Sequence, residues 1–123
     1  MASELANYKR FIDAIVGLRP AVSARWILEG RRWPEMKESP ENKRINELVD
    51  SLDEQQKEVL AELLNSTYDS GIHDVLAYLN EEAEEGLRLT SSGKDFPFEP
   101  FDTGMHYDFV CRSEGDSWPD ERT

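Results

Sequence analysis

The residues with the clearest chemical potential in this 123-residue chain lie between positions 106 and 120. The stretch HYDFVCRSEGDSWPD holds a histidine, several acids, the only cysteine and a tryptophan. A cysteine nucleophile needs an imidazole base within hydrogen-bonding reach, because the thiolate is the reactive form. Cys111 and His106 are therefore the first pair to consider.

Local geometry separates this pair whichever element the segment forms. In a strand, His106 and Cys111 point to opposite faces. In a helix, five positions of about 100° each leave them roughly 140° apart around the axis. We therefore predict no catalytic residue here and interpret Cys111 as a small buried hydrophobe. Asp108 and Arg112 share a face in both geometries, so a structural ion pair is expected between them.

A second constellation suggests metal chemistry. Asp69 and His73 lie four residues apart and share a face on a continuous helix, where His106 could join them as a third ligand. The chain has only two histidines and carries no HExxH, CxxC or EF-hand spacing. A local hydrogen bond made by His73 explains the pattern more simply, so no metal site and no cofactor are predicted.

The elements that must position these residues are mainly helical. Between residues 3 and 86, apolar residues recur at steps of three and four, which is typical of amphipathic helices. We expect a bundle of four to five helices on one core, with a break inside STYDSG (66–71) that either kinks the last helix or divides it. The expected helix boundaries lie near Ser3, Gly17, Pro20, Gly30, Ser39, Asp53 and Gly86.

The same periodicity predicts which side chains face inward. In the second helix they are Val22, Trp26 and Ile27. In the third helix they are Ile45, Leu48, Val49 and Leu52.

After Gly86 the apolar period changes. Residues 87–98 predict a short hairpin that turns at Ser91-Ser92-Gly93 and packs on the helices. Residues 105–115 permit a strand or a helix, and both remain open. The fold class is therefore mainly α, a single domain over residues 1–123, with a helical core (3–86) and a hairpin or extended segment (87–123) against it.

Aromatic residues in the loops are candidates for binding a partner. Exposed tryptophans and phenylalanines often anchor interfaces. The competing interpretation is that they fold back and complete the core, because large aromatics stabilise a fold by burial. The candidates are Trp33, Phe96, Phe98, Phe101 and Trp118.

The net charge of −12 is unevenly distributed along the chain. Residues 1–44 carry nine Lys/Arg and six Asp/Glu, whereas residues 45–123 carry five and twenty. An acidic body of this kind repels phosphate backbones and anionic lipids, so neither nucleic acid nor a membrane is an expected partner. It could instead attract a basic protein. Solubility alone would also explain the charge.

The remaining composition fits a cytoplasmic protein. A single cysteine cannot form an intrachain disulfide, which fits a reducing compartment. No apolar run is long enough to span a bilayer, and charged residues interrupt the N-terminal segment in an amphipathic pattern unlike a signal peptide.

Three stretches resemble those of a family of small uncharacterised bacterial cytosolic proteins. They are GIHDVLAYLNE (71–81), FEPFDTG (98–104) and YDFVCRSEGDSWPD (107–120). The resemblance covers the second half of the chain. It implies a bacterial cytosolic origin and a compact, mostly helical fold, and it implies no activity.

Two functional hypotheses follow. The first is a protein-binding or regulatory module without catalytic activity, whose acidic face engages a basic partner. The second is a small enzyme or ligand binder that uses His73, His106, Asp108 or Cys111 in a cleft. Homo-oligomerisation through spare apolar helix surface is compatible with both.

Overall fold

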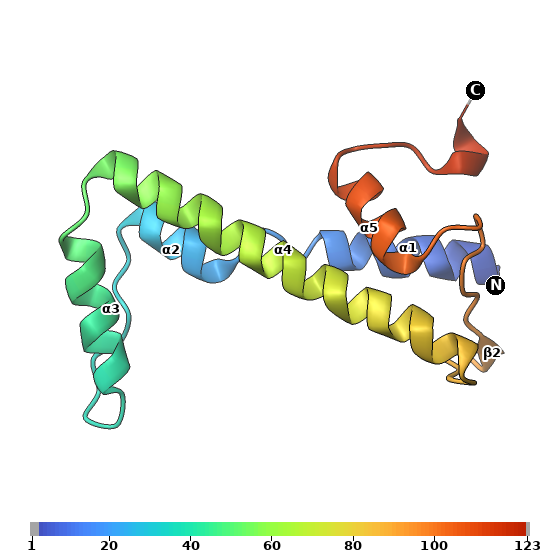
Figure 1. The fold of residues 1–123 in the computed structure, drawn as a ribbon, viewed down its shortest axis with the longest axis horizontal. Coiled ribbons are helices and arrows are strands. Elements are labelled where there is room, and N and C mark those ends of the chain that lie inside the picture. The colour runs from blue at the N-terminus through green and yellow to red at the C-terminus, as the bar shows by residue number, and fades with distance from the viewer. Residues whose placement is uncertain (1–2, 123) are drawn as a thin grey trace. The chain divides into compact units, whose positions relative to one another are not determined.

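The computed structural model describes residues 3–122 as five α-helices, a two-stranded antiparallel sheet and a short 3-10 helix (Figure 1). The mainly helical fold with a short hairpin is confirmed. No helix in the described range is both long enough and apolar enough to cross a membrane. The elements are α1 (Glu4–Val16), α2 (Val22–Glu29), α3 (Pro40–Asp50), α4 (Glu54–Glu84), β1 (Thr90–Ser91), β2 (Lys94–Asp95), α5 (Met105–Ser113) and η1 (Pro119–Glu121).

The chain folds as two compact units. The first unit contains the residues up to Arg19 and those from Asp69 onward, and the second unit is Pro20–Tyr68. The long helix α4 contributes its first half to the second unit and its second half to the first. Each unit has a hydrophobic cluster of its own. The single-domain organisation stays a prediction that unfolding measurements can test.

The first unit is built around an aromatic core in which Tyr8 and Ile12 of α1 are fully buried. Ser3 caps α1 as predicted, because its Oγ accepts a hydrogen bond from the Ala6 N–H at 3.0 Å. The ring of Tyr8 lies 5.5 Å from that of Phe96 and 6.0 Å from that of Trp118, between ring centroids. The buried cluster is Tyr8, Ile12, Leu76, Phe96, Met105, Phe109 and Trp118.

The predicted hairpin forms with its turn at the expected place. Thr90 pairs with Asp95 and Ser91 with Lys94, so Ser92 and Gly93 form the two-residue loop. Both loop residues have positive φ, 53° and 78°, as in the tight turns that match the twist of paired strands. The Phe96 N–H then donates to the Leu89 carbonyl at 2.6 Å, which directs the Phe96 side chain toward the core.

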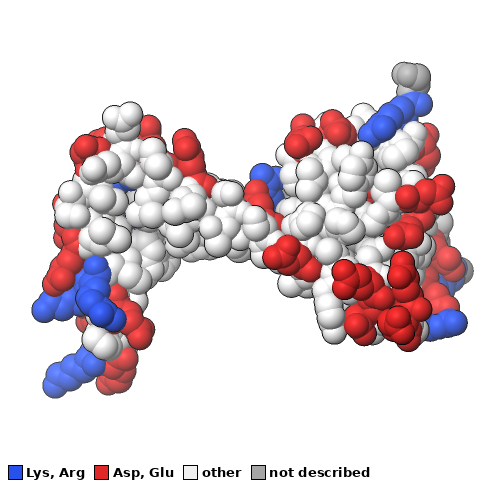
Figure 2. All heavy atoms as spheres, in the orientation of Figure 1, with Lys and Arg blue, Asp and Glu red and all other residues white. Residues whose placement is uncertain are grey.

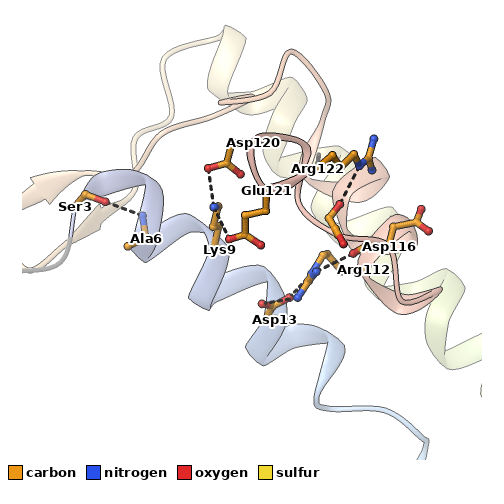
Figure 3. Close-up of polar contacts among 10 residues, drawn as sticks. Ser3, Ala6, Lys9, Asp13, Arg112, Asp116, Asp120, Glu121 and Arg122 are labelled. Atoms are coloured by element: carbon orange, nitrogen blue, oxygen red, sulfur yellow. Dashed lines mark hydrogen bonds and ion pairs between the residues drawn. The ribbon is translucent and has the colours of Figure 1, made fainter.

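Residues 105–113 form a helix, which decides the alternative left open by the sequence. Helix α5 packs against α1. Figure 3 shows how the last residues are tied to α1: Lys9 Nζ lies 2.8 Å from Asp120 Oδ2 and 3.0 Å from Glu121 Oε1. These contacts hold the C-terminal segment over the aromatic core.

The second unit has a much smaller core, made of Ala21, Ala24 and Ala61 with Leu64 and Tyr68 packed against them. Helix α2 ends at Gly30, whose φ of 72° suits a left-handed cap. The prediction that Val22 faces inward was wrong, since this side chain is 52% exposed. The buried face runs instead through the alanines and Ile27, because small residues allow close helix packing.

In α3 the buried residues are Asn46 and Val49, whereas Leu48 is 55% exposed. The predicted stripe was therefore wrong at Leu48 and at Ile45, which is 36% exposed. Asn46 takes the inward position because its amide binds the backbone of the preceding loop. Its Oδ1 accepts from the Trp33 N–H at 2.9 Å, and its Nδ2 donates to the Trp33 carbonyl at 2.8 Å.

Helix α4 runs without interruption from Glu54 to Glu84, so the predicted division within residues 66–71 was wrong. The Thr67 hydroxyl donates to the Leu63 carbonyl, one turn back, at 2.9 Å, a bond that a threonine makes without leaving the helix. The next residues continue the apolar pattern, since Ile72 and Leu76 both pack in the first unit's core.

Candidate functional site

The most unusual polar group in the first unit is the carboxylate of Asp108, which is only 4% exposed. It receives two hydroxyl donors: the Tyr8 phenol on Oδ2 and the Thr103 hydroxyl on Oδ1, the latter at 2.6 Å. Asp108 also lies in the first turn of α5, where the helix dipole favours a negative charge. A buried carboxylate is thus held by hydrogen bonds and a dipole, without a cation.

Tyr8 is the most perturbed titratable group in this network. Burial raises the pKa of its phenol far above the ordinary value, and the hydrogen bond and negative charge of Asp108 raise it further. The phenol therefore stays protonated and acts as a fixed donor. This arrangement stabilises the core and does not resemble a catalytic acid or base poised near neutral pH.

Asn80 organises the N-terminal end of α5 from a buried position on α4. Its Oδ1 accepts from the Met105 N–H at 2.8 Å, which satisfies a donor that the helix itself cannot pair. Its Nδ2 donates to Glu99 Oε1 at 3.2 Å. The sequence analysis missed both Asn80 and Asn46. The available signal was that each asparagine stands at a helix position that the apolar period assigns to an apolar residue.

The two histidines come together, although Cys111 does not join them. The His73 and His106 rings lie 5.0 Å apart between centroids, nearly perpendicular. His106 Nδ1 is buried and makes no hydrogen bond to the described residues. The ring of His106 covers Gly104 so closely that a Cβ built there would meet His106 Cε1 at 2.5 Å.

The third metal candidate, Asp69, is engaged elsewhere. Arg19 Nε lies 2.9 Å from Asp69 Oδ1, and His73 Nδ1 lies 3.4 Å from Asp74 Oδ1. Within residues 3–122, no three His, Cys, Asp or Glu side chains are grouped so that they could hold a metal ion. The structure therefore pairs the imidazoles without building a metal centre from these candidates.

Three of the four residues proposed for a ligand cleft line two pockets of the first unit, and the fourth, His106, lines neither of these two. One, of about 240 Å³, is lined by Asp108 and Cys111 together with Thr103, Tyr107, Trp118 and others. In this pocket a hydrogen bond with Cys111 raises the pKa of Tyr107. The other, of about 370 Å³, is lined by His73 with Arg19 and Asp69. His106 and Cys111 both lie on α5, where helix geometry separates them as predicted.

The expected ion pair between Asp108 and Arg112 was wrong. Arg112 instead forms a two-point contact with Asp13 of α1, at 2.8 Å and 3.1 Å, while its guanidinium lies 4.9 Å from the Trp118 ring centroid. Its Nη1 also donates to the Asp116 carbonyl at 2.7 Å (Figure 3). Asp108 and Arg112 therefore each bind residues outside α5, which their spacing along the sequence could not predict.

The aromatic partner-binding candidates all lie against other parts of their own unit. Phe96 and Trp118 are 8% and 3% exposed, so neither presents its ring to a partner in this conformation. Phe98 and Phe101 are partly buried against the same core. Trp33, in the second unit, packs edge-on against Trp26 at 5.3 Å between ring centroids. These positions agree with the core interpretation, because large aromatics stabilise a fold by burial, and partner binding by these residues stays a prediction.

The C-terminal end of α4 carries a dense group of carboxylates, visible as the red gathering over the last turns of this helix (Figure 2). We call Glu81, Glu82, Glu84 and Glu85 the acidic end of α4. All are exposed except Glu82, which is partly buried. The last turn contains no basic residue. Negative charge at a helix C-terminus is disfavoured by the helix dipole, so this group lowers the stability of the helix that carries it.

The second unit carries an exposed apolar groove of about 520 Å³ between α3 and the start of α4. Leu48, Val59 and Leu63 are 55%, 57% and 60% exposed along it. Polar residues Asp53, Gln55 and Gln56 complete its lining. We call the surface formed by Leu48, Leu52, Val59, Leu60 and Leu63 the apolar groove.

Comparison with known proteins yields a family and no assigned activity. No curated protein and no solved structure matches the chain. Residues 1–120 match the family described as "Family of unknown function (DUF6547)". The chain therefore belongs to the DUF6547 family of unknown function.

Proposed function

We propose that this chain is a protein-binding module without catalytic activity, and that its acidic first unit engages a basic protein. The main observation behind the proposal is the acidic end of α4. Four carboxylates lie there at the C-terminus of a 31-residue helix, which is the negative end of the helix dipole. A cationic partner would relieve both their mutual repulsion and their repulsion from the helix dipole. The proposal includes a reducing, cytoplasmic setting for the single free cysteine.

The charge balance of the first unit supports this assignment. Its sequence holds seven Lys/Arg and sixteen Asp/Glu, a net charge of −9, compared with −3 for the second unit. Lys9, Arg19 and Arg112 pair with carboxylates outside the acidic end, as does Arg88. Within residues 3–122, no ion pair reaches Glu81, Glu82, Glu84 or Glu85, so their charge is available to a partner.

The proposal also agrees with the polar network around Asp108. That network is fully engaged in holding α1, α5 and the preceding loop together. The two imidazoles lie against each other, 5.0 Å apart between ring centroids, and no hydrogen bond among the described residues joins either one to the thiol. The exposed carboxylates of the first unit are thus open to a partner, whereas its buried polar groups are used to hold the fold together. This arrangement suits recognition better than catalysis.

A charge-matched pair of variants tests the proposal. Glu82→Gln, Glu84→Gln and Glu85→Gln together remove three charges from the acidic end of α4. Glu54→Gln, Glu58→Gln and Glu62→Gln remove three from the first half of the same helix. Immobilised protein should retain basic proteins from native lysate at low salt and lose them at high salt. The first variant should lose this capture and the second should keep it.

Equal capture by both variants would contradict the assigned surface. Capture by neither the wild type nor the variants, at any salt concentration, would remove the proposal itself.

A further inference from the structure

We propose that the pocket between α5 and the C-terminal segment (114–122) of the first unit binds a small carboxylic acid with an aromatic body. Among the described residues, those that line this pocket belong to α5 and to the chain on either side of it, and none belongs to the acidic end of α4. The inference therefore does not depend on the basic partner proposed above. It rests on a guanidinium without a carboxylate, a phenol with a weak acceptor, and an aromatic wall.

The pocket is small, and its walls differ in exposure. A volume of about 240 Å³ lies between Tyr107 and Cys111 of α5 on one side and the C-terminal segment on the other. Sites for drug-sized ligands hold about 300–1,000 Å³, so this pocket suits a smaller molecule. Trp118 forms a buried wall, since it is 3% exposed, whereas Tyr107 is 56% exposed and lies at the edge toward solvent.

Two of the charged groups that line the pocket already have partners within the fold. The carboxylate of Asp108 accepts hydrogen bonds from the hydroxyls of Tyr8 and Thr103. The guanidinium of Arg112 binds both carboxylate oxygens of Asp13, through Nε and Nη2. Because the fold satisfies both charges, neither of them determines which ligand the pocket accepts.

Arg122 is the cation of this pocket that has no carboxylate partner among residues 3–122. Its Nε donates to the Ser117 carbonyl at 3.2 Å (Figure 3). Its two terminal nitrogens form no hydrogen bond to any described residue. A guanidinium presents its N–H donors as a planar fork that matches the two oxygens of a carboxylate. Arg122 therefore favours an anionic ligand and opposes a cationic one.

The phenol of Tyr107 is a second donor that a carboxylate can engage. A hydrogen bond with Cys111 raises the pKa of Tyr107, and the positive charge of Arg122 opposes this shift, so the three groups lie within range of one another. Sulfur is a weak hydrogen-bond acceptor, so the phenol forms a stronger bond by donating to a carboxylate oxygen instead. Arg122 and Tyr107 together thus form an anion site at the edge of the pocket.

The aromatic wall and the charge of the unit determine what kind of anion fits. Phe101 and Trp118 both line the pocket, and their rings stack at 5.6 Å between centroids with an interplanar angle of 28°. A planar apolar body covers such rings, whereas a bare inorganic anion leaves them uncovered. The net charge of −9 on the first unit disfavours a ligand with several negative charges. A small aromatic monocarboxylate meets all of these conditions.

The first test titrates the full chain with benzoate, phenylacetate and 3-phenylpropionate. We expect at least one of them to raise the melting temperature, because a ligand that binds the folded state stabilises it. The same ligand should shift the indole N–H resonance of Trp118 in NMR spectra. Benzylamine carries the ring with a positive charge, and inorganic phosphate carries negative charge without a ring. Both should bind at least tenfold more weakly than the best carboxylate.

The second test compares variants of exposed side chains. Arg122→Gln should weaken binding of the best carboxylate roughly tenfold or more, because the charged fork is lost. Arg10→Gln is the matched control: Arg10 is exposed in the same unit, bonds to Asn7 instead of a carboxylate, and lies outside the pocket. This control should keep the wild-type affinity. Tyr107→Phe retains the ring, removes the hydroxyl and should weaken binding by a smaller factor.

The proposal is overturned if none of the three carboxylates binds. Equal affinity for phenylacetate and benzylamine, or an equal loss in Arg122→Gln and Arg10→Gln, also overturns it, because the charge of Arg122 would then not be recognised. Phosphate that binds as tightly as the best carboxylate would contradict the aromatic body. Circular dichroism identifies any variant that has lost its fold, and the selectivity of the wild type among the probes then decides the question.

Discussion

Tyr8 and Asp108 are a hundred positions apart in the sequence and share a buried hydrogen bond in the folded chain. The bond explains why Tyr8, a polar residue on the apolar stripe of α1, is fully buried. Its hydroxyl has a charged acceptor, and Asp108 has a second donor in Thr103. Buried polar groups that are fully paired fix one arrangement of the core, because any other arrangement would leave a carboxylate unsatisfied.

Tyr8 makes the stability of the fold sensitive to alkaline pH. Because the folded-state pKa of its phenol is raised above that of the unfolded chain, its contribution is complete below about pH 10. Above this pH only the unfolded chain ionises, so stability should fall by about 1.4 kcal/mol per pH unit from this group. Urea unfolding between pH 9 and 11 should show a shallower decline for Tyr8→Phe than for the wild type. Tyr78→Phe, at a 58% exposed site, should keep the wild-type slope; equal slopes for all three proteins would refute this account.

Gly104 is the residue whose lack of a side chain matters most. An added Cβ would meet the His106 ring at 2.5 Å, so Gly104→Ala should destabilise the fold by about 1–3 kcal/mol through overpacking. The double variant with His106→Ala should recover much of this loss, which a purely backbone effect would not allow. Gly71→Ala is the control: nothing lies within 4 Å of its added Cβ, and inside α4 it should stabilise by about 0.5–1 kcal/mol. Thermal and urea unfolding measure all three.

At the scale of elements, α4 is the helix whose two ends differ most in how their charged residues interact with the helix dipole. Its first turn carries Glu54, favourable at the positive pole of the dipole, and its last turn carries only acids. The carboxylates of the acidic end therefore lower the stability of α4. Natural proteins keep such arrangements where function benefits from them.

Neutralising the acidic end should stabilise α4. Glu84→Gln with Glu85→Gln should raise the melting temperature at low salt, by an amount equivalent to about 0.3–1 kcal/mol per charge, and the gain should shrink as salt screens it. Glu54→Gln, at the other pole, should give no gain. If the double variant melts at or below the wild-type temperature in low salt, the dipole argument does not hold for this helix.

At the scale of the whole molecule, the two units differ greatly in how much apolar surface their cores bury. The cluster of the first unit contains seven large or medium side chains, whereas that of the second contains three alanines, and Ile27 and Val49 are the other buried apolar residues of the second unit. Because burial of apolar surface is the main stabilising term, opening of the second unit should cost less free energy.

Hydrogen exchange should reveal this difference. Backbone amides of α2 and α3 should exchange faster than those of α1 and α5. Uniform protection across all helices would instead support one cooperative domain over residues 1–123, as the sequence predicted.

The sequence by itself determined the helical elements, because period, caps and turn residues are local. The Ser3 cap, the Gly30 stop and the Ser92-Gly93 turn all appear where their chemistry required. Helix geometry was likewise sufficient to separate His106 from Cys111. The division expected within residues 66–71 did not form: α4 continues through this segment, and Ile72 and Leu76, which follow it, pack in the core of the first unit.

Only the tertiary structure determined which hydrogen-bond and ion-pair partners the polar residues have. Asp108 was expected to bind Arg112, four residues away, and binds Tyr8 instead, while Arg112 binds Asp13. Asn46 and Asn80 occupy positions that periodicity assigns to apolar residues, because loop and helix-end N–H groups needed acceptors there. A hydrogen bond depends on positions in space that a pattern along the chain does not contain, so helices could be predicted and their polar contacts could not.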